Sequence, residues 1–276
     1  ADWSRGHVIR GHRDALYSAQ VSPDGKAIAT AGYDREATTW SPVTLETVKS
    51  FRGHNDAIYS LAYSPDGKLL ATASGDRTVK LWDVATGQRL DTFSQPAKDQ
   101  TTVAFSPDGR FVVAGGVDMR VRVWQIGETG REGTNPILFA RFAHEGPILK
   151  VAFSPDGDLL ASSSEDRRIK IWETKTFTQV AVLERQPDWA AAIAFSKDGR
   201  NLLVGRMNGE FRLYPVDPAW ANVSGGLHYL DESFHAPEIS LSVSPPVTAE
   251  LEPNDSPATA TPMAAPGIAK GVLKGK

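Results

Sequence analysis

The sequence contains no cysteine, so disulfide bonds and thiolate chemistry are excluded, while either a reducing or an oxidising compartment remains open. No apolar run approaches the roughly 20 residues that cross a bilayer as a helix, and we predict no membrane insertion. The formal net charge is only -3 over 276 residues, so we also predict no nucleic-acid partner. No basic and apolar export signal follows Ala1.

A tetrapeptide recurs along most of the chain. SPDG or SKDG begins, at intervals of 42, 42, 48 and 42 residues, at Ser22, Ser64, Ser106, Ser154 and Ser196. Eighteen residues after each Ser stands an aromatic residue: Trp40, Trp82, Trp124, Trp172 and Tyr214. Ten residues before each Ser stand His12, His54, Pro96, His144 and Gln186. Three columns that keep one register over five copies indicate an internal repeat.

Each copy is predicted to form four short β-strands. In the second copy the expected strands are residues 57–63, 69–74, 78–83 and 88–93, separated by turn-forming Asp-Gly, Gly-Asp and Thr-Gly pairs. A lone sheet of this size cannot bury two apolar faces, so the copies must stack on one another. The prediction is an all-β fold, a β-propeller of four-stranded antiparallel blades. A five-fold β-sandwich or a solenoid is the alternative.

The residues Gly53-His54, the SPDG turn, a Ser-x-Asp turn and Trp82-Asp83 at this period resemble the WD-repeat family of β-propellers. The resemblance covers residues 11–217 and divides them into blades at about 11–52, 53–94, 95–142, 143–184 and 185–217. Propellers close with about 4–8 blades, so five complete blades plus remnants are predicted to be a fragment of a larger ring. Residues 1–10 align with the outer strand of a truncated preceding blade, and the six extra residues, within 127–136, are expected to lengthen a surface loop.

Beyond the fifth copy the pattern fades. Residues 218–246 are expected to be irregular or a degenerate blade strand, and residues 247–276 are rich in Pro and Ala, as in linkers. The stretch that begins with EPND at residues 252–255 resembles the opening of the bacterial pre-peptidase C-terminal (PPC-type) domain, a β-sandwich truncated here. A plain linker is the alternative. The resemblance implies a larger multidomain bacterial protein and favours export to the periplasm or cell envelope over the cytoplasm.

The WD-repeat resemblance also implies a structural role for the repeated histidines. In that pattern the His bonds the Asp of the second turn and a hydroxyl that receives the Trp indole N–H. The predicted structural tetrads are His54, Ser74, Asp76 and Trp82, and His144, Ser164, Asp166 and Trp172. The first copy has Gly32 at the expected hydroxyl position. Such Ser-His-Asp sets look like a hydrolase triad but lack a strained nucleophile turn and an oxyanion hole.

No motif for a metal, a phosphate or a dinucleotide is present. There is no H-E-x-x-H, no paired Cys and no Gly-rich phosphate loop, and the Asp of each SPDG is a turn residue. We therefore predict no catalytic residue, no metal and no cofactor.

The family resemblance implies a partner-binding face at the start of the first strands and at the turns between the second and third strands. The residues expected there are Asp14, Tyr17, Tyr33, Asp56, Tyr59, Lys98, Thr101, Lys150, Glu165, Asp188 and Trp189. Exposed aromatic residues beside charges are typical of interface anchors. Tyr17 and Tyr59 occupy equivalent positions on adjacent blades and should be neighbours; half-buried packing between inner strands is the alternative reading of each.

The predicted function is a non-catalytic protein- or peptide-binding scaffold within a larger multidomain bacterial protein. One alternative is a propeller that binds or gates substrate for a catalytic domain outside this sequence. An intrinsic propeller hydrolase or lyase is disfavoured, because the columns that face the channel offer mainly Tyr, Thr, Leu and Ala. Fold does not determine function, and the identity of the partner is not readable from these residues.

Overall fold

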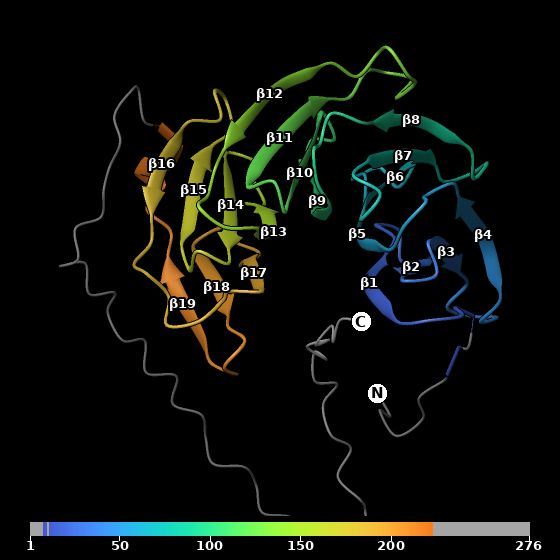
Figure 1. Cartoon of the computed structure of the whole chain (residues 1–276), viewed down its shortest axis with the longest axis horizontal. Helices are drawn as coiled ribbons and strands as arrows, with labels where there is room; N and C mark the ends of the chain where they lie inside the picture. Colours follow the sequence, from blue (N-terminus) through green and yellow to red (C-terminus); the bar gives the residue numbers. More distant parts are fainter. Residues whose placement is uncertain (1–7, 10, 223–276) are drawn as a thin grey trace, which may run out of the picture. The chain divides into compact units, whose positions relative to one another are not determined.

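The computed structural model describes residues 8–9 and 11–222, which all belong to the first of two compact units, residues 1–237. In this described part, nineteen β-strands form five antiparallel sheets, followed by one short 3-10 helix (Figure 1). The all-β class and the antiparallel blades predicted from the repeat are confirmed. No helix in the same residues has the length and apolar character to span a bilayer.

The five sheets follow the five copies of the repeat, and we number them blade 1 to blade 5. Blade 1 contains β1 (Leu16–Val21), β2 (Ile28–Gly32), β3 (Glu36–Trp40) and β4 (Thr47–Arg52). Blade 2 contains β5 (Ile58–Tyr63), β6 (Leu69–Ser74), β7 (Val79–Asp83) and β8 (Arg89–Phe93). Blade 3 contains β9 (Gln100–Phe105), β10 (Phe111–Gly116), β11 (Arg120–Gln125) and β12 (Ile137–Phe142). Blade 4 contains β13 (Ile148–Phe153), β14 (Leu159–Ser164), β15 (Ile169–Glu173) and β16 (Gln179–Val182).

Blade 5 has three described strands, β17 (Ala192–Phe195), β18 (Asn201–Gly205) and β19 (Phe211–Pro215). The described residues, which end at residue 222, therefore contain no fourth strand for the fifth copy. Pro218 begins a 3-10 helix, η1 (Pro218–Asn222), instead. The Asp217 carboxylate accepts the Ala219 N–H at 2.8 Å, and Trp220 packs into the core shared with blade 4. A proline after a capping Asp starts helical turns and cannot donate to a strand ladder.

The SPDG turn joins the first two strands of each blade by the same hydrogen bonds. In blade 2 the Ser64 hydroxyl donates to the Asp66 carboxylate at 2.6 Å and accepts the Leu69 N–H at 2.9 Å. Gly67 has a φ of 71°, in the left-handed region that glycine adopts without strain. Equivalent Ser–Asp bonds occur in the other four blades. The tetrapeptide recurs because its side chains complete the turn.

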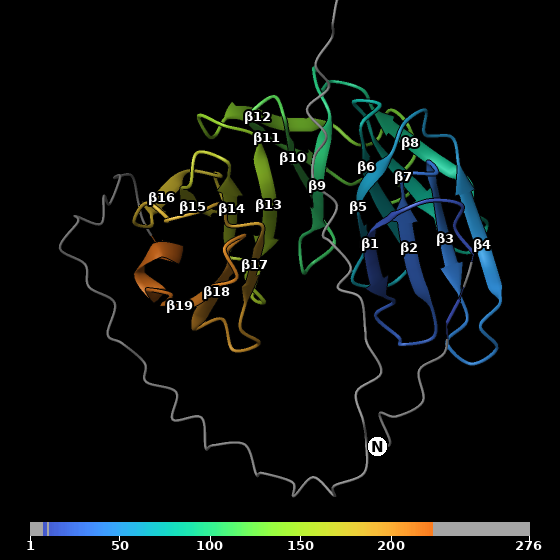
Figure 2. The same cartoon turned by 60° about the horizontal axis from the view of Figure 1, so that its bottom comes forward.

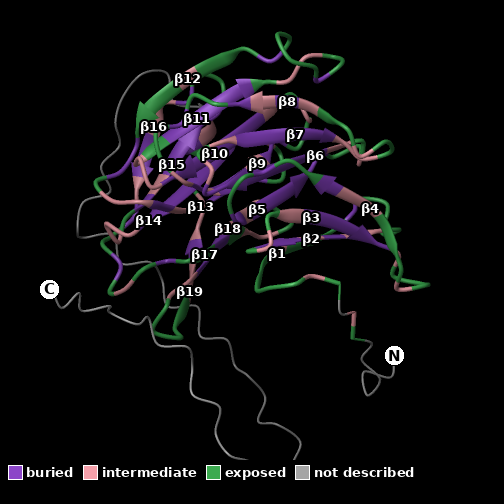
Figure 3. Ribbon diagram, turned by 45° about the vertical axis from the view of Figure 1, so that its right-hand side comes forward, coloured by how far each residue is buried: buried purple, intermediate pink, exposed green. Residues whose placement is uncertain are grey.

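Consecutive blades are joined through their first strands, which lie along the inner side of the arc, while β4, β8, β12 and β16 lie outside (Figures 1 and 2). Hydroxyls on these inner strands accept an N–H from the next blade: Ser18 from Leu61, Ser60 from Val103, and Thr102 from Val151. Four apolar clusters fill the spaces between blades 1 and 2, 2 and 3, 3 and 4, and 4 and 5. The core is therefore between sheets, and Figure 3 shows it buried.

The described blades form an open arc, because no cluster of described residues joins blade 5 to blade 1. Leu16 on β1 is 52% exposed, whereas Ile58 and Ile148, at the same position of blades 2 and 4, are 0% exposed. At the other end, Phe211 on β19 is 68% exposed, whereas the equivalent Ile169 is 0% exposed. The two end faces thus carry the apolar side chains that the inner blades bury.

The loop with the six extra residues folds back onto blade 2. The Asn135 amide donates to the Asp91 carboxylate on β8 at 2.7 Å, and the Glu132 N–H donates to the Leu90 carbonyl at 3.0 Å. The tip is exposed, as expected for a surface loop, but the buried Asn135 anchors its base to the neighbouring blade.

Candidate functional site

The repeated His, Asp and Trp side chains meet inside the blades through one hydroxyl. In blade 2, His54 Nδ1 lies 2.8 Å from Asp76 Oδ2, and His54 Nε2 lies 2.7 Å from the Thr72 hydroxyl. The Trp82 indole N–H donates to the same hydroxyl at 2.8 Å. Blade 4 repeats this arrangement with His144, Asp166, Ser162 and Trp172. Blade 1 repeats it with His12, Asp34, Thr30 and Trp40.

The hydroxyl that completes each tetrad differs from the one predicted. Ser74 bonds the Asp56 carbonyl and the Asp76 N–H instead, and Ser164 makes the equivalent bonds in blade 4. Trp82 pairs with Leu70 across the sheet, so Thr72 is the next residue on the same face. Ser74 is four residues from that pairing point, roughly 13 Å along the strand, and out of reach of the indole.

The position of the hydroxyl in the repeat also explains why blade 1 has a complete tetrad, although Gly32 occupies the predicted hydroxyl position there. The column is occupied by Thr30, Thr72, Ala114, Ser162 and Val204. A hydroxyl thus occurs only in the copies that have the His, and this correlation was available in the sequence. The column that was predicted instead does not show this correlation, because it has Gly32, without a hydroxyl, in the first copy, which has His12.

Blades 3 and 5 satisfy the same buried positions with other side chains. In blade 3, where Pro96 replaces the His, the Arg122 guanidinium pairs with Asp118 at 2.7 Å. The Trp124 N–H then donates to Gln95 at 3.2 Å. In blade 5 the Gln186 carbonyl oxygen accepts from Arg206 at 3.0 and 2.8 Å. In both blades other side chains thus take the place of the His and its hydroxyl as partners of the buried groups, although Arg122 Nη1 is left without a hydrogen-bond partner.

The tetrads of blades 2 and 4 favour the neutral form of His54 and His144. A carboxylate only accepts, so Nδ1 of His54 carries the proton, and Nε2 accepts from the Thr72 hydroxyl, which in turn accepts from Trp82. Burial lowers the pKa of His54, and the hydrogen bond to Asp76 opposes this only in part. Burial likewise lowers the pKa of His144. Every polar atom of the set is used internally, which leaves no free nucleophile or base.

We expect the free energy of unfolding to fall as the pH drops below about 6.5. An unfolded His binds a proton near pH 6.5, whereas the folded His54 and His144 resist protonation, so unfolding takes up protons in this range. Each His contributes up to about 1.4 kcal/mol per pH unit. Urea unfolding at pH 7 and pH 5 measures the difference.

The matched control is the double variant His54→Gln and His144→Gln, which uses the residue that blade 5 has at this position. It should be less stable at pH 7 and should lose much less stability between pH 7 and pH 5. Equal losses in both proteins would show that the histidines are not the groups that titrate.

Below about pH 4 the carboxylates add a further loss of stability in the wild type. Burial alone would raise the pKa of Asp166, but hydrogen bonds from His144 and two backbone N–H groups lower it to about 2.

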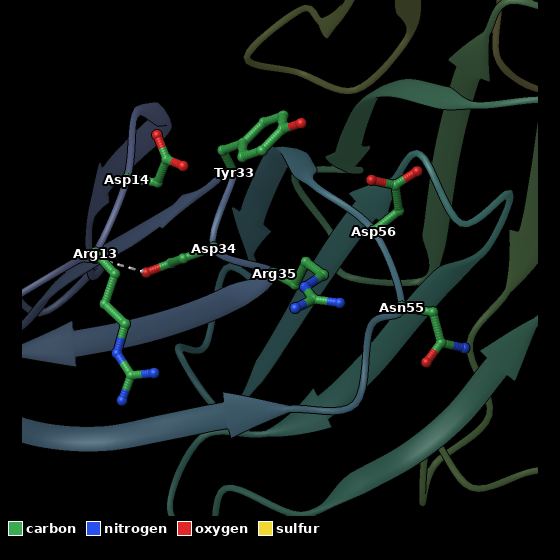
Figure 4. A pocket seen from close by; sticks show the side chains of 7 residues that line it. All are labelled: Arg13, Asp14, Tyr33, Asp34, Arg35, Asn55 and Asp56. Carbon is green, nitrogen blue, oxygen red and sulfur yellow. Dashed lines mark hydrogen bonds between the residues drawn. The ribbon is translucent and has the colours of Figure 1, made fainter.

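The structure brings part of the predicted partner face together on blades 1 and 2. The rings of Tyr17 and Tyr59 are neighbours, as expected, with centroids 5.3 Å apart. Beside them a pocket of about 400 Å³ lies between the two blades (Figure 4). Its lining includes Arg13, Asp14, Tyr33, Arg35, Asn55 and Asp56. The sequence prediction included three of these, Asp14, Tyr33 and Asp56.

The remaining residues of the predicted face are distributed along blades 3 to 5. The Thr101 hydroxyl donates to the Ile148 carbonyl and so serves the contact between blades 3 and 4. Lys150 occupies the position in blade 4 that Ser60 and Thr102 occupy in blades 2 and 3. The residue of blade 4 that is equivalent to Tyr59 is Leu149, one position earlier. Burial lowers the pKa of Lys150. Lys98 is exposed, Asp188 and Glu165 are half-buried, and Trp189 on blade 5 is 42% exposed.

The described residues contain no group of three or more His, Asp or Glu side chains arranged to hold a metal ion. A family model described as the IFT122 first beta-propeller matches residues 4–218, which include all five blades. No curated protein matches the chain. The predicted resemblance to a pre-peptidase C-terminal domain falls outside both the matched and the described residues.

Proposed function

The chain belongs to the family of the IFT122 first beta-propeller, a WD-repeat type of propeller, and from this we propose that it is a non-catalytic scaffold that binds a protein or peptide. Propellers of this type are generally non-catalytic. We further propose, from the resemblance at residues 250–275, that the scaffold is one part of a larger multidomain bacterial protein.

One contrast supports this proposal. The side chains that resemble catalytic groups are buried and bonded to one another, as in the His54–Asp76–Thr72–Trp82 set. Large aromatic side chains, by contrast, are exposed where the first strands begin and at the adjacent turns: Tyr17 is 49%, Tyr33 is 55% and Trp189 is 42% exposed. Exposed aromatics among charges favour recognition of a polypeptide.

A photo-crosslinking residue such as p-benzoylphenylalanine, placed at Tyr33 or Trp189 in cells of the source organism, tests the proposal. We expect discrete crosslinked protein species from both positions. The matched control is Val48 on the outer strand β4, which is 52% exposed but lies away from the predicted face. Equal crosslinking from all three positions, or none from Tyr33 and Trp189, would argue against a binding face there.

A further inference from the structure

Three tyrosines gather where blades 1 and 2 present the starts of their first strands. The Tyr17 and Tyr59 rings lie 5.3 Å apart at an interplanar angle of 52°. Tyr33 belongs to the adjoining turn of blade 1 and is 55% exposed. In the equivalent turn of blade 2 the residue is Gly75. The cluster presents aromatic surface to solvent on a part of the face where blades 3 and 4 have Thr101 and Leu149 instead.

Carboxylates surround these rings. A Cβ added to Gly75 would lie 3.0 Å from Asp56 Oδ2 and 3.4 Å from Tyr59 Cε2, so the Asp56 carboxylate and the Tyr59 ring converge on this glycine. Burial first, and then the negative charges of Asp99 and Asp56, raise the pKa of Tyr59. Asp99 is the one carboxylate here that the sequence analysis did not select.

The carboxylates have no cationic partner among the described residues. Asp14 and Asp56 each accept the N–H of the following residue, at 2.7 and 2.8 Å, through Oδ1. Among the described residues, neither forms an ion pair with a Lys or Arg, and nor does Asp99. In Figure 4 the side chains of Asp14, Tyr33 and Asp56 lie on one side of the pocket, and the guanidinium groups of Arg13 and Arg35 lie on the other.

We infer that this tyrosine–aspartate patch, formed by Tyr17, Tyr33, Tyr59, Asp14, Asp56 and Asp99, binds a Lys or Arg side chain of a partner polypeptide. Aromatic faces attract cations, and nearby carboxylates add charge complementarity. The inference rests on the proposed function and specifies its partner: a segment that presents a cationic side chain to blades 1 and 2.

Titration of the full 276-residue chain with short peptides tests the inference. The probes are acetyl-Gly-Ser-X-Ser-Gly-amide peptides in which X is Arg, Lys, Leu or Glu, and the protein carries ¹³C-labelled tyrosine rings for NMR. We expect the Arg and Lys peptides to shift the resonances of Tyr17, Tyr33 and Tyr59. The resonances of Tyr63 and Tyr214, which are buried in the blades, should not move.

Two exposed positions give variants that should fold normally. Asp56→Asn removes the charge but retains an oxygen for the Ala57 N–H, and Tyr33→Leu removes an exposed ring. Each should weaken binding of the Arg peptide about three- to tenfold. The matched control is Asp66→Asn, which removes the same charge from the SPDG turn at the other end of β5 and should leave binding unchanged.

Several outcomes would overturn the inference. The first is equal binding of the Leu and Arg peptides. The second is tighter binding of the Glu peptide, which would indicate that Arg13 and Arg35 bind the ligand. The third is an equal effect of Asp56→Asn and Asp66→Asn on binding of the Arg peptide. If crosslinking from Tyr33 and Trp189 succeeds while the Arg and Lys peptides leave the tyrosines unmoved, the scaffold function stands and the cationic partner is rejected. Failure of both experiments would reject both.

Discussion

Replacing Ile58 by Ala should lower the free energy of unfolding by about 2–5 kcal/mol, whereas Leu16→Ala should change it by less than about 0.5 kcal/mol. The two residues occupy the same position of the repeat. Ile58 is 0% exposed because blade 1 packs over it, and Leu16 is 52% exposed on the open face of blade 1. The cost of truncation follows the contacts that are lost and not the residue type. Urea unfolding followed by tryptophan fluorescence measures both values.

The other end of the arc supplies an independent control. Ile169→Ala should be costly, because Ile169 is 0% exposed in the core between blades 4 and 5, and Phe211→Ala should be nearly neutral at 68% exposure. A loss of several kcal/mol for Leu16→Ala or Phe211→Ala would show that the end faces are covered in solution by something beyond the described residues. Such a result would give the contribution of that one side chain to the packing of a further blade or another chain on the end face.

Much of the fold was predictable because the interactions that form each turn of the repeat lie within short segments of the sequence. The SPDG turn is complete within six residues, so Ser64, Asp66 and Gly67 identify it in the sequence without knowledge of the rest of the fold. The spacing of the turn and the aromatic residue then places the strands. The neighbouring positions of Tyr17 and Tyr59 followed from the same register.

The predictions from which the structure differs depended on contacts across strands or on local breaks in the repeat. The choice of Ser74 over Thr72 required the pairing of Trp82 with Leu70, which sequence spacing alone does not reveal. In the described part of blade 5, Pro218 begins a 3-10 helix where the repeat predicts the approach to a fourth strand, because its ring favours a helical turn over a strand ladder.

The candidate site was only partly predictable, since it combines residues from several segments. Columns of the repeat located Asp14, Tyr33 and Asp56, but Asp99 comes from another column. Gly75 contributes to the site because it has no side chain, so the Asp56 carboxylate and the Tyr59 ring can approach its backbone. The assignment of Lys150 to the face depended on a register one residue away from that of Tyr59. Side chains that act together across blades become apparent only when the blades are placed side by side.

Thr72→Val should lower the free energy of unfolding by about 2–4 kcal/mol, since it deletes one hydroxyl and leaves two buried groups without a partner. Valine has nearly the same shape as threonine, so no cavity opens. The Trp82 indole N–H and His54 Nε2 both bond this hydroxyl, at 2.8 and 2.7 Å, and Trp82 is 1% exposed. Water cannot replace the lost partner at such a site without disturbing the packing. Chemical denaturation at pH 7 measures the loss.

The conservative variant Thr72→Ser separates the hydroxyl from the rest of the side chain. Blade 4 has Ser162 at this position, with the indole of Trp172 at 2.9 Å, so a serine should retain the tetrad and cost less than about 1 kcal/mol. Ser74→Ala removes the hydroxyl that bonds the Asp56 carbonyl and the Asp76 N–H, outside the tetrad, and should cost less than Thr72→Val. A larger loss for Ser74→Ala than for Thr72→Val would mean that Ser74, and not Thr72, joins the His to the Trp.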